Sequence, residues 1–188
     1  KHRYDKQEVI EVMLPYLKEI TDLGVKTFIE CTPKYIGRDV ELLKELADLS
    51  GLQILTNTGQ YARENFLPAE TYEISVDALA DKWIKEFQKG IEGTPIRPGF
   101  IKTAVEGGKL RDIEKKTLKA AAITSNATGM TIATHTGYGK PALEIIDLLA
   151  EYNVSAEKWI FVHAHIEDDF SLILDIANKG AWIELDGL

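Results

Sequence analysis

The stretch Gly99-Phe100-Ile101-Lys102-Thr103 decides how we interpret the fold of this chain. It is a short apolar run that ends in a lysine, a pattern typical of a buried strand. A lysine is rarely fully buried unless its charge is paired or the side chain is a ligand, so neighbouring groups must account for Lys102. Two later runs, Thr131–His135 and Trp159–His163, are equally apolar, and each ends in a histidine. If the three strands are parallel, their ends share one rim, where parallel sheets and barrels place their chemistry.

The rest of the chain alternates predicted strands with predicted helices. Pro15 interrupts the first helical pattern and predicts a kink or a later helix start. A long loop is expected after Thr58-Gly59-Gln60-Tyr61 and through Pro68. Apolar strands in strict alternation with helices predict a parallel sheet that helices cover. Further strands are expected at 26–31, 52–57 and 181–185, and helices at 7–20, 40–50, 77–90, 112–125, 141–152 and 167–178.

Two architectures satisfy this alternation, a doubly wound open sheet and a (β/α)8 barrel. No Gly-x-Gly-x-x-Gly follows a predicted strand and no Gly-x-x-x-x-Gly-Lys-Ser/Thr loop occurs, which weakens the case for a nucleotide-binding open sheet. The predicted fold class is therefore α/β, a (β/α)8 TIM barrel, with residues 1–188 in a single domain. The predicted strands correspond to strands two to seven. We expect strands one and eight to lie before Lys1 and after Leu188, in a longer chain.

The composition favours a small-molecule partner. The 188 residues carry a formal net charge of -8, which disfavours binding to nucleic acid and to anionic membrane surfaces. No signal peptide is apparent, and no apolar run approaches the roughly 20 residues that span a bilayer. Cys31 is the single cysteine, so an internal disulfide is excluded and a reducing, cytoplasmic compartment is expected. We expect Cys31 to be a small buried hydrophobic residue.

The three strand-end side chains suggest metal chemistry. Neutral imidazoles such as those of His135 and His163 are common ligands of zinc and similar ions, but an ammonium group cannot bind a metal. Desolvation beside cations lowers a lysine pKa, and the free amine of Lys102 could then add carbon dioxide to form a carbamate that bridges two ions. Two ions about 3.5–4 Å apart polarise a carbonyl or phosphoryl oxygen and generate a hydroxide nucleophile, which predicts hydrolysis. Two alternatives stay open: a metal-free phosphosugar-type barrel that uses Lys102 as a Schiff-base or proton-transfer residue, and a non-catalytic ligand-binding barrel.

Several short motifs occur in an order and spacing that resemble the phosphotriesterase-like family of the amidohydrolase superfamily. The resemblance implies a carbamylated, catalytic Lys102 that bridges two divalent ions, with zinc the best match, and His135 and His163 as ligands of the more exposed ion. It also implies a homodimer and a metal-bound hydroxide that attacks a lactone, a carboxylic ester or a phosphoester. The motifs are Thr32-Pro33 with Gly37-Arg38-Asp39, Thr58-Gly59-Gln60-Tyr61, Gly99-Phe100-Ile101-Lys102, Thr134-His135-Thr136, Val162-His163 and Leu185-Asp186.

Other positions bear on the substrate. Tyr61 matches a pocket tyrosine of the lactonase-like branch, which favours a lactone or an ester, although a loop-packing role fits the residue equally well. His165 stands where relatives usually carry an acidic residue, so it either contacts substrate or caps the next helix. Period-two alternation sends His163 and His165 to the same face, and we expect His163 to be the ligand because the apolar run ends there. Gly187 stands where lactonase-like members often carry an arginine.

The family also has a His-x-His pair in strand one and an aspartate in strand eight. We expect both to lie outside this sequence. His2 lacks the His-x-His context and precedes the first helix, so we assign it no metal role.

Overall fold

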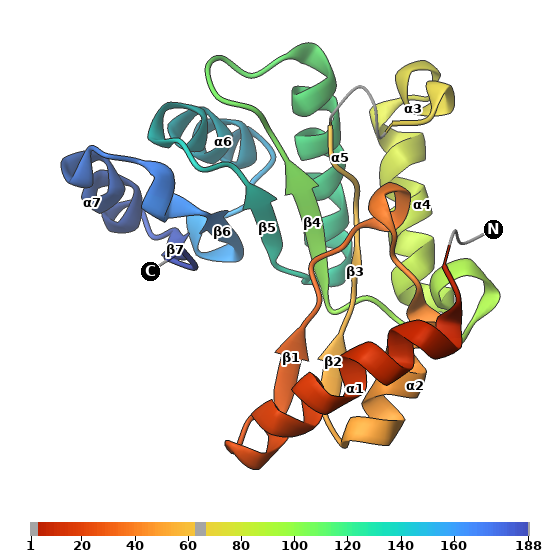
Figure 1. Cartoon of the computed structure of the whole chain (residues 1–188). Coiled ribbons are helices and arrows are strands. Elements are labelled where there is room, and N and C mark those ends of the chain that lie inside the picture. The colour runs from red at the N-terminus through yellow and green to blue at the C-terminus, as the bar shows by residue number, and fades with distance from the viewer. Residues whose placement is uncertain (1–3, 63–66, 188) are drawn as a thin grey trace.

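A computed structural model describes residues 4–62 and 67–187 of the chain (Figure 1). His2 and part of the predicted loop before Pro68 lie outside the described residues. The strands are β1 Thr27–Ile29, β2 Gln53–Leu55, β3 Asn57–Thr58, β4 Phe100–Ala104, β5 Ile132–His135, β6 Trp159–Val162 and β7 Trp182–Ile183. The α-helices are α1 Lys6–Asp22, α2 Val40–Ser50, α3 Ala69–Glu73, α4 Val76–Lys89, α5 Asp112–Thr128, α6 Gly139–Glu151 and α7 Phe170–Asn178. Short 3-10 turns are η1 Lys34–Ile36, η3 Ile91–Gly93, η4 Ala156–Lys158 and η5 Ala164–Ile166.

All strand pairs are parallel, which confirms the predicted α/β class. β3 to β7 form one sheet in the order of the chain, and β1 pairs with β2 in a second sheet. A doubly wound sheet reverses its strand order at a switch point, and this sheet does not. The strands therefore follow one another in chain order, as they do in a barrel. Among the described residues β7 does not pair with β1, so the sheet stays open.

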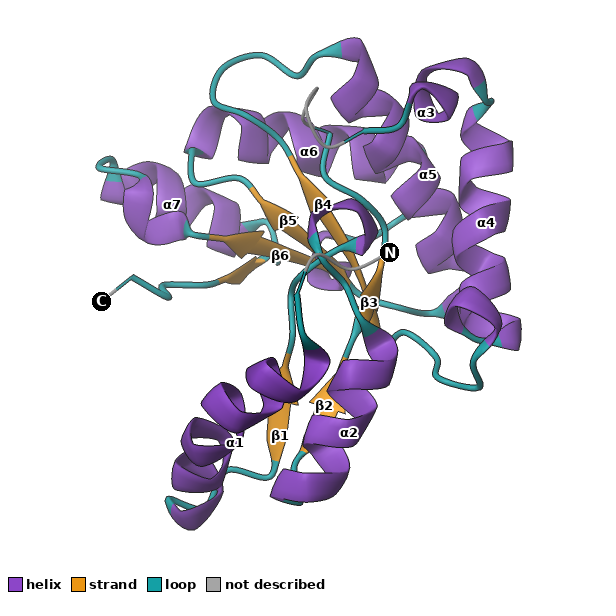
Figure 2. Cartoon of the chain, turned by 45° about the vertical axis from the view of Figure 1, so that its right-hand side comes forward, coloured by secondary structure: helices purple, strands orange, loops and turns teal. Residues whose placement is uncertain are grey.

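Alternate residues of the central strands lie on two different faces. On one face Ile101, Ile132 and Phe161 are fully buried in the main hydrophobic cluster with residues of α4, α5 and α6. Figure 2 shows these helices on one side of the sheet. On the other face Phe100 and its neighbours Ala133 and Val162 form a small separate cluster. We call this second side the inner face.

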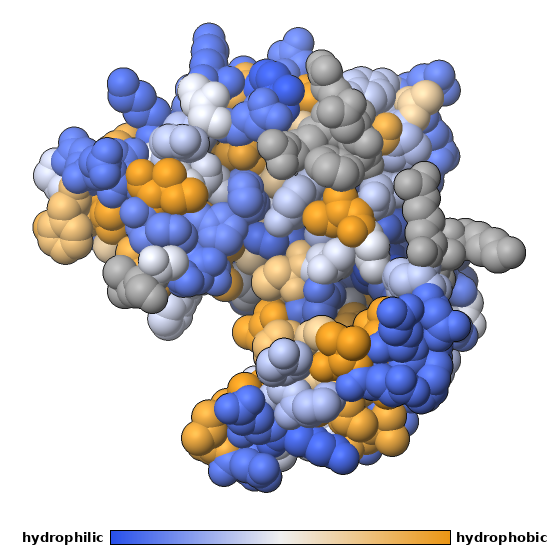
Figure 3. Space-filling view, viewed as in Figure 1, coloured by the Kyte–Doolittle hydropathy of each residue, from blue (hydrophilic) through white to orange (hydrophobic). Residues whose placement is uncertain are grey.

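The inner face is open in the described part of the chain. Ile29, Leu55, Phe100 and Trp182 line a hollow there, together with Cys31. Figure 3 shows apolar side chains gathered over β1 and β2 and at the hollow beside them. The expectation that Cys31 is buried was wrong: the residue is exposed, because no described element covers the end of β1 on this side.

The predicted strand at 52–57 is divided between the two sheets. β2 pairs with β1, whereas β3 pairs with β4. The division occurs at Asn57, whose side-chain amide donates to the backbone oxygens of Glu30 at 3.0 Å and Thr32 at 3.1 Å. After β1 ends, hydrogen bonds from the Asn57 side chain, rather than backbone hydrogen bonds between strands, join the two segments.

Several helix boundaries differ from the predicted ones. α1 begins at Lys6, with Asp5 as its N-cap, and continues through Pro15. Its buried Ile10 and Leu17 pack against α2, and this packing outweighs the roughly 3 kcal/mol that a proline costs inside a helix. α7 begins at Phe170, rather than at 167, because Asp169 accepts hydrogen bonds from two backbone amides of its first turn. α3 lies between the loop expected through Pro68 and the helix expected from 77, in a stretch for which no element was predicted.

The helices carry no membrane signal. Within residues 4–62 and 67–187, none is both long enough and apolar enough to cross a bilayer.

Candidate metal centre

Lys102 lies on the inner face of β4 and is one of the most buried side chains of the protein, with 1% of its surface exposed. It pairs in register with Ala133 of β5, so His135, two residues further along, lies on the same face. Lys102 forms no ion pair with the described residues. Burial lowers the pKa of Lys102, and the charges of Cys31, Glu184 and Asp186 oppose this shift only in part. Burial therefore disfavours the charged form of this amine.

Gly59 makes the close packing around Lys102 possible. A Cβ atom at Gly59 would lie 2.3 Å from the backbone oxygen of Lys102, and the residue has a φ of +98°. Only glycine combines this approach with this backbone conformation at low cost. The segment that follows β3 is thereby held against β4.

Tyr61 lies between Lys102 and His135. An isolated parallel bridge joins Tyr61 to Ala104 at the end of β4. Its ring centroid is 5.8 Å from Lys102 Nζ and 5.5 Å from the centroid of the His135 ring. A substrate above these groups would therefore meet the Tyr61 ring.

The structure brings His135 and His163 together. His135 is the last residue of β5 and pairs with Val162, the last residue of β6. The rings of His135 and His163 lie edge to face with centroids 4.5 Å apart. His163 adopts a left-handed conformation with φ of 64°, so the period-two alternation used for the prediction ends at Val162. Two imidazoles therefore meet at the ends of adjacent strands, as the strand-end pattern predicted.

Asp186 joins two histidines and was given no role in the sequence analysis. Its Oδ2 lies 2.6 Å from Nδ1 of His163, and its Oδ1 lies 3.1 Å from Nδ1 of His165. The first contact is a hydrogen bond from His163. The second is not, because His165 Nδ1 has no hydrogen-bond partner among the described residues. Burial would raise the pKa of Asp186, but its backbone hydrogen bond and the nearby His163 and His165 together lower it. A useful signal was present, since Asp186 follows an apolar run just as His135 and His163 end theirs.

His165 and Gly187 are coupled in space. A Cβ atom at Gly187 would lie 2.2 Å from His165 Nε2. The ring of His165 thus occupies the volume that a side chain at position 187 would need. The two departures from the family pattern, a histidine at 165 and a glycine at 187, are one structural feature.

The residues present fit a divalent metal site. His163, His165 and Asp186 each offer a ligand atom, and these atoms lie within 4.8 Å of one another. His135 adds a further imidazole beside His163, and Lys102 adds a buried amine that forms no ion pair with the described residues. Imidazole nitrogens and carboxylate oxygens are the usual ligands of zinc and related ions.

The family model described as "Phosphotriesterase family" matches residues 1–188. The chain belongs to the phosphotriesterase family. The predicted resemblance is thereby confirmed.

Relatives of known name support the same assignment. The phosphotriesterase homology protein of Escherichia coli (strain K12) is 31% identical over 173 residues, covering 90% of this chain and 59% of the relative. The aryldialkylphosphatase of Saccharolobus solfataricus is 32% identical over 187 residues, and the match covers 98% of this chain and 59% of that protein. The human N-acetyltaurine hydrolase is 30% identical over 181 residues, covering 95% and 51%. The chain thus spans between about half and three-fifths of the length of these relatives.

A solved structure matches the fold. The crystal structure of the Escherichia coli phosphotriesterase homology protein, complexed with phosphate in its active site, superposes with a TM-score of 0.88 at 28% identity. The match covers 94% of this chain and 61% of the other. The parallel α/β architecture of this chain is therefore that of its family.

Proposed function

We propose that this chain forms the catalytic rim of a metal-dependent hydrolase that cleaves lactones, carboxylic esters or phosphoesters. The supporting observation is the meeting of Lys102, His135 and His163 on one face of three adjacent strands. The family membership and the names of two relatives, an aryldialkylphosphatase and an N-acetyltaurine hydrolase, support a hydrolytic reaction.

Lys102, His135 and His163 would hold two divalent ions, with zinc the expected metal. The neutral amine of Lys102 attacks the carbon of carbon dioxide and loses a proton, which leaves a carbamate with two oxygens. Burial favours this reaction because it lowers the pKa of Lys102. When bound, the ions would polarise a carbonyl or phosphoryl oxygen of the substrate and activate a water molecule.

Asp186 would position His163. Its carboxylate accepts the hydrogen bond from His163 Nδ1, which leaves Nε2 as the nitrogen that can face a metal. Carboxylate partners of this kind set the tautomer and the orientation of ligand histidines.

Tyr61 and His165 would contact the substrate. Tyr61 places an aromatic ring beside both Lys102 and His135, which suits a lactone or an ester with an apolar body. A lactone or carboxylic ester is therefore the proposed native substrate, with phosphotriester cleavage as a secondary activity. His165 fills the space beside Gly187, so it presents an imidazole where related lactonases carry an arginine.

The decisive experiment detects the modified lysine. The purified protein is equilibrated with 13C-labelled bicarbonate, its metal content is quantified, and a carbamate carbon signal is sought by NMR. The proposal requires that signal together with bound metal, and it requires the loss of both in Lys102→Met. Lys18→Gln is the matched control, because Lys18 is an exposed lysine of α1.

Other results would favour the alternative functions. A Schiff base at Lys102, trapped by borohydride in a metal-free protein, would support the phosphosugar-type reaction. Bound metal and a carbamate without turnover of lactone, aryl ester and phosphotriester substrates would support a ligand-binding barrel.

A further inference from the structure

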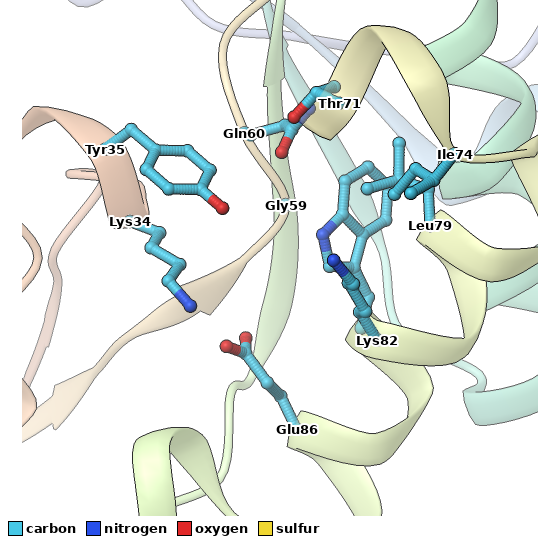
Figure 4. A pocket seen from close by; sticks show the side chains of 10 residues that line it. Lys34, Tyr35, Gly59, Gln60, Thr71, Ile74, Leu79, Lys82 and Glu86 are labelled. Carbon is cyan, nitrogen blue, oxygen red and sulfur yellow. The ribbon is translucent and has the colours of Figure 1, made fainter. Parts of the chain in front are cut away.

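A second polar hollow lies between η1, the segment after β3, and α4, and the metal-site residues do not line it (Figure 4). Its empty volume, which includes open solvent at the mouth, is about 360 Å³, so the enclosed part is small and suits only a compact group. Figure 4 shows Tyr35, Lys34 and Glu86 around one common space, with Gln60 and Thr71 side by side at one edge of it. The polar side chains that line it are those of Lys34, Tyr35, Gln60, Thr71, Lys82 and Glu86, and Trp83 adds an indole.

Gln60 and Thr71 are the buried polar residues among those described that line this hollow, and Gln60 is the one with an unpaired donor. Only 2% of its surface is exposed, and its Nε2 has no hydrogen-bond partner among the described residues. A buried donor without a partner keeps the full cost of its desolvation. A donor of this kind in the lining of a hollow can bind an acceptor that enters it.

Glu86 is the one carboxylate among the described residues that line the hollow, and its charge is already paired. Arg38 donates to both carboxylate oxygens of Glu86, at 2.8 and 3.0 Å. The hydroxyl of Thr58 donates to the same group at 2.7 Å. Glu86 therefore opposes a bound anion only weakly.

The two lysines at the hollow keep donors for a ligand. Lys34 Nζ lies 3.4 Å from Glu92, and Lys82 Nζ lies 2.5 Å from Glu70. Both are solvent-exposed ion pairs, which are weak and readily exchanged. A lysine ammonium has three donors, so each lysine can also bind a second acceptor.

We propose that this hollow binds a compact oxyanion, the carboxylate or phosphate group of a small molecule. Gln60 Nε2 donates the buried hydrogen bond, and Lys34 and Lys82 supply the positive charge. The site is separate from the metal centre, because successive residues of an extended segment point to opposite sides. Gln60 lines this hollow, whereas Tyr61 lies against His135.

Occupancy of the hollow also bears on the metal centre. Gln60 lies between Gly59, which packs against the backbone of Lys102, and Tyr61, which bridges to Ala104. A ligand held by Gln60 would therefore fix the segment that borders Lys102.

The test is an NMR titration of the purified, metal-loaded protein with inorganic phosphate and, separately, with acetate. We expect saturable shifts of the Trp83 indole N–H and the Gln60 side-chain amide for at least one anion, and the anion that binds identifies the group. Gln60→Leu should weaken binding by about tenfold or more, because a hydrogen bond to a charged group is lost. It should not lower the melting temperature of the free protein, because it removes an unpaired donor. Lys82→Gln should also weaken binding, and Lys18→Gln should not.

Three results would overturn the proposal. The first is the absence of saturable shifts at Trp83 and Gln60 with both anions. The second is shifts confined to the His135 ring, which would place the anion at the metal centre. The third is unchanged binding in Gln60→Leu and Lys82→Gln.

Discussion

The substitution Lys102→Met separates the cost of burying the lysine from its benefit as a ligand. Methionine keeps the unbranched, flexible stem and removes the amine. In the metal-free protein the amine of Lys102 is buried with 1% exposure and no ion-pair partner among the described residues, so any proton that it carries is destabilising. An unsatisfied buried polar group costs about 1–3 kcal/mol. We therefore expect metal-free Lys102→Met to be more stable than the wild type by about this amount at neutral pH.

The dependence on pH gives a sharper signature. Burial lowers the pKa of Lys102 in the folded state, whereas the unfolded state keeps the ordinary value of 10.5. Between the lowered pKa and 10.5 the unfolded chain binds more protons than the folded chain, so the stability of the wild type rises with pH in this window. Below this pH window Lys102 is charged in both states, and the folded wild type bears the full cost of burying that charge. The Lys102→Met protein lacks this slope, so the difference between the two proteins shrinks as the pH rises.

The assay is urea unfolding of both metal-free proteins across this range, followed by tryptophan fluorescence. A difference of 1–3 kcal/mol corresponds to a shift in melting temperature of roughly 2–12 °C for a chain of this size. With metal loaded, the order should reverse, because the variant loses a ligand. If metal-free Lys102→Met is less stable than the wild type, or if the two proteins share one pH slope, the reasoning about this buried amine is refuted.

Other substitutions test the surroundings of the site. Asp186→Asn should lower metal affinity roughly 10- to 100-fold, measured against a competing chelator, because the ligand histidine loses its orienting carboxylate. Gly59→Ala should lower the free energy of unfolding by about 1–3 kcal/mol more than Gly108→Ala, because only the first clashes with backbone. Both glycines have nearly the same φ, +98° and +97°, so backbone strain cancels in this comparison. Arg38→Leu should destabilise by about 3–5 kcal/mol in thermal or urea unfolding, because it leaves Glu86 largely buried and unpaired.

Each of these predictions has an outcome that contradicts it. Unchanged metal affinity in the Asp186→Asn protein would mean that His163 is oriented by other contacts. Equal losses in the two glycine variants would mean that the close approach to β4 relaxes at no cost. For Arg38, the double variant with Glu86→Leu should recover much of the loss, and a purely additive result would show that the two side chains do not interact.

The central strands could be predicted because their signal is local. β4, β5 and β6 are apolar runs with turn residues on both sides, and each lies within a residue or two of its predicted range. The division between β2 and β3 could not be predicted, because it depends on the tertiary hydrogen bonds of the Asn57 amide. Local strand propensity cannot show where a side chain, rather than the backbone, makes the hydrogen bonds between two strands.

The role of Arg38 shows the same limit. The sequence predicted a helix at 40–50, and that helix is α2 with Asp39 as its N-cap. Arg38 instead extends to Glu86, 48 residues further along, and to the backbone oxygen of Asn57. An ion pair across that separation leaves no pattern in a single sequence.

The metal centre was predictable to the extent that parallel strands align their ends. The rule found Lys102, His135 and His163, and it would also have found Asp186 had it been applied to the final apolar run. The alignment of strand ends could not predict the close approach of His165 to Gly187. This approach depends on how the 3-10 turn that holds His165 packs against the residue after Asp186. An arginine at position 187 would have to displace the His165 ring. Gly187→Arg alone should therefore disturb this part of the candidate site, because the His165 ring lies where the new side chain would begin.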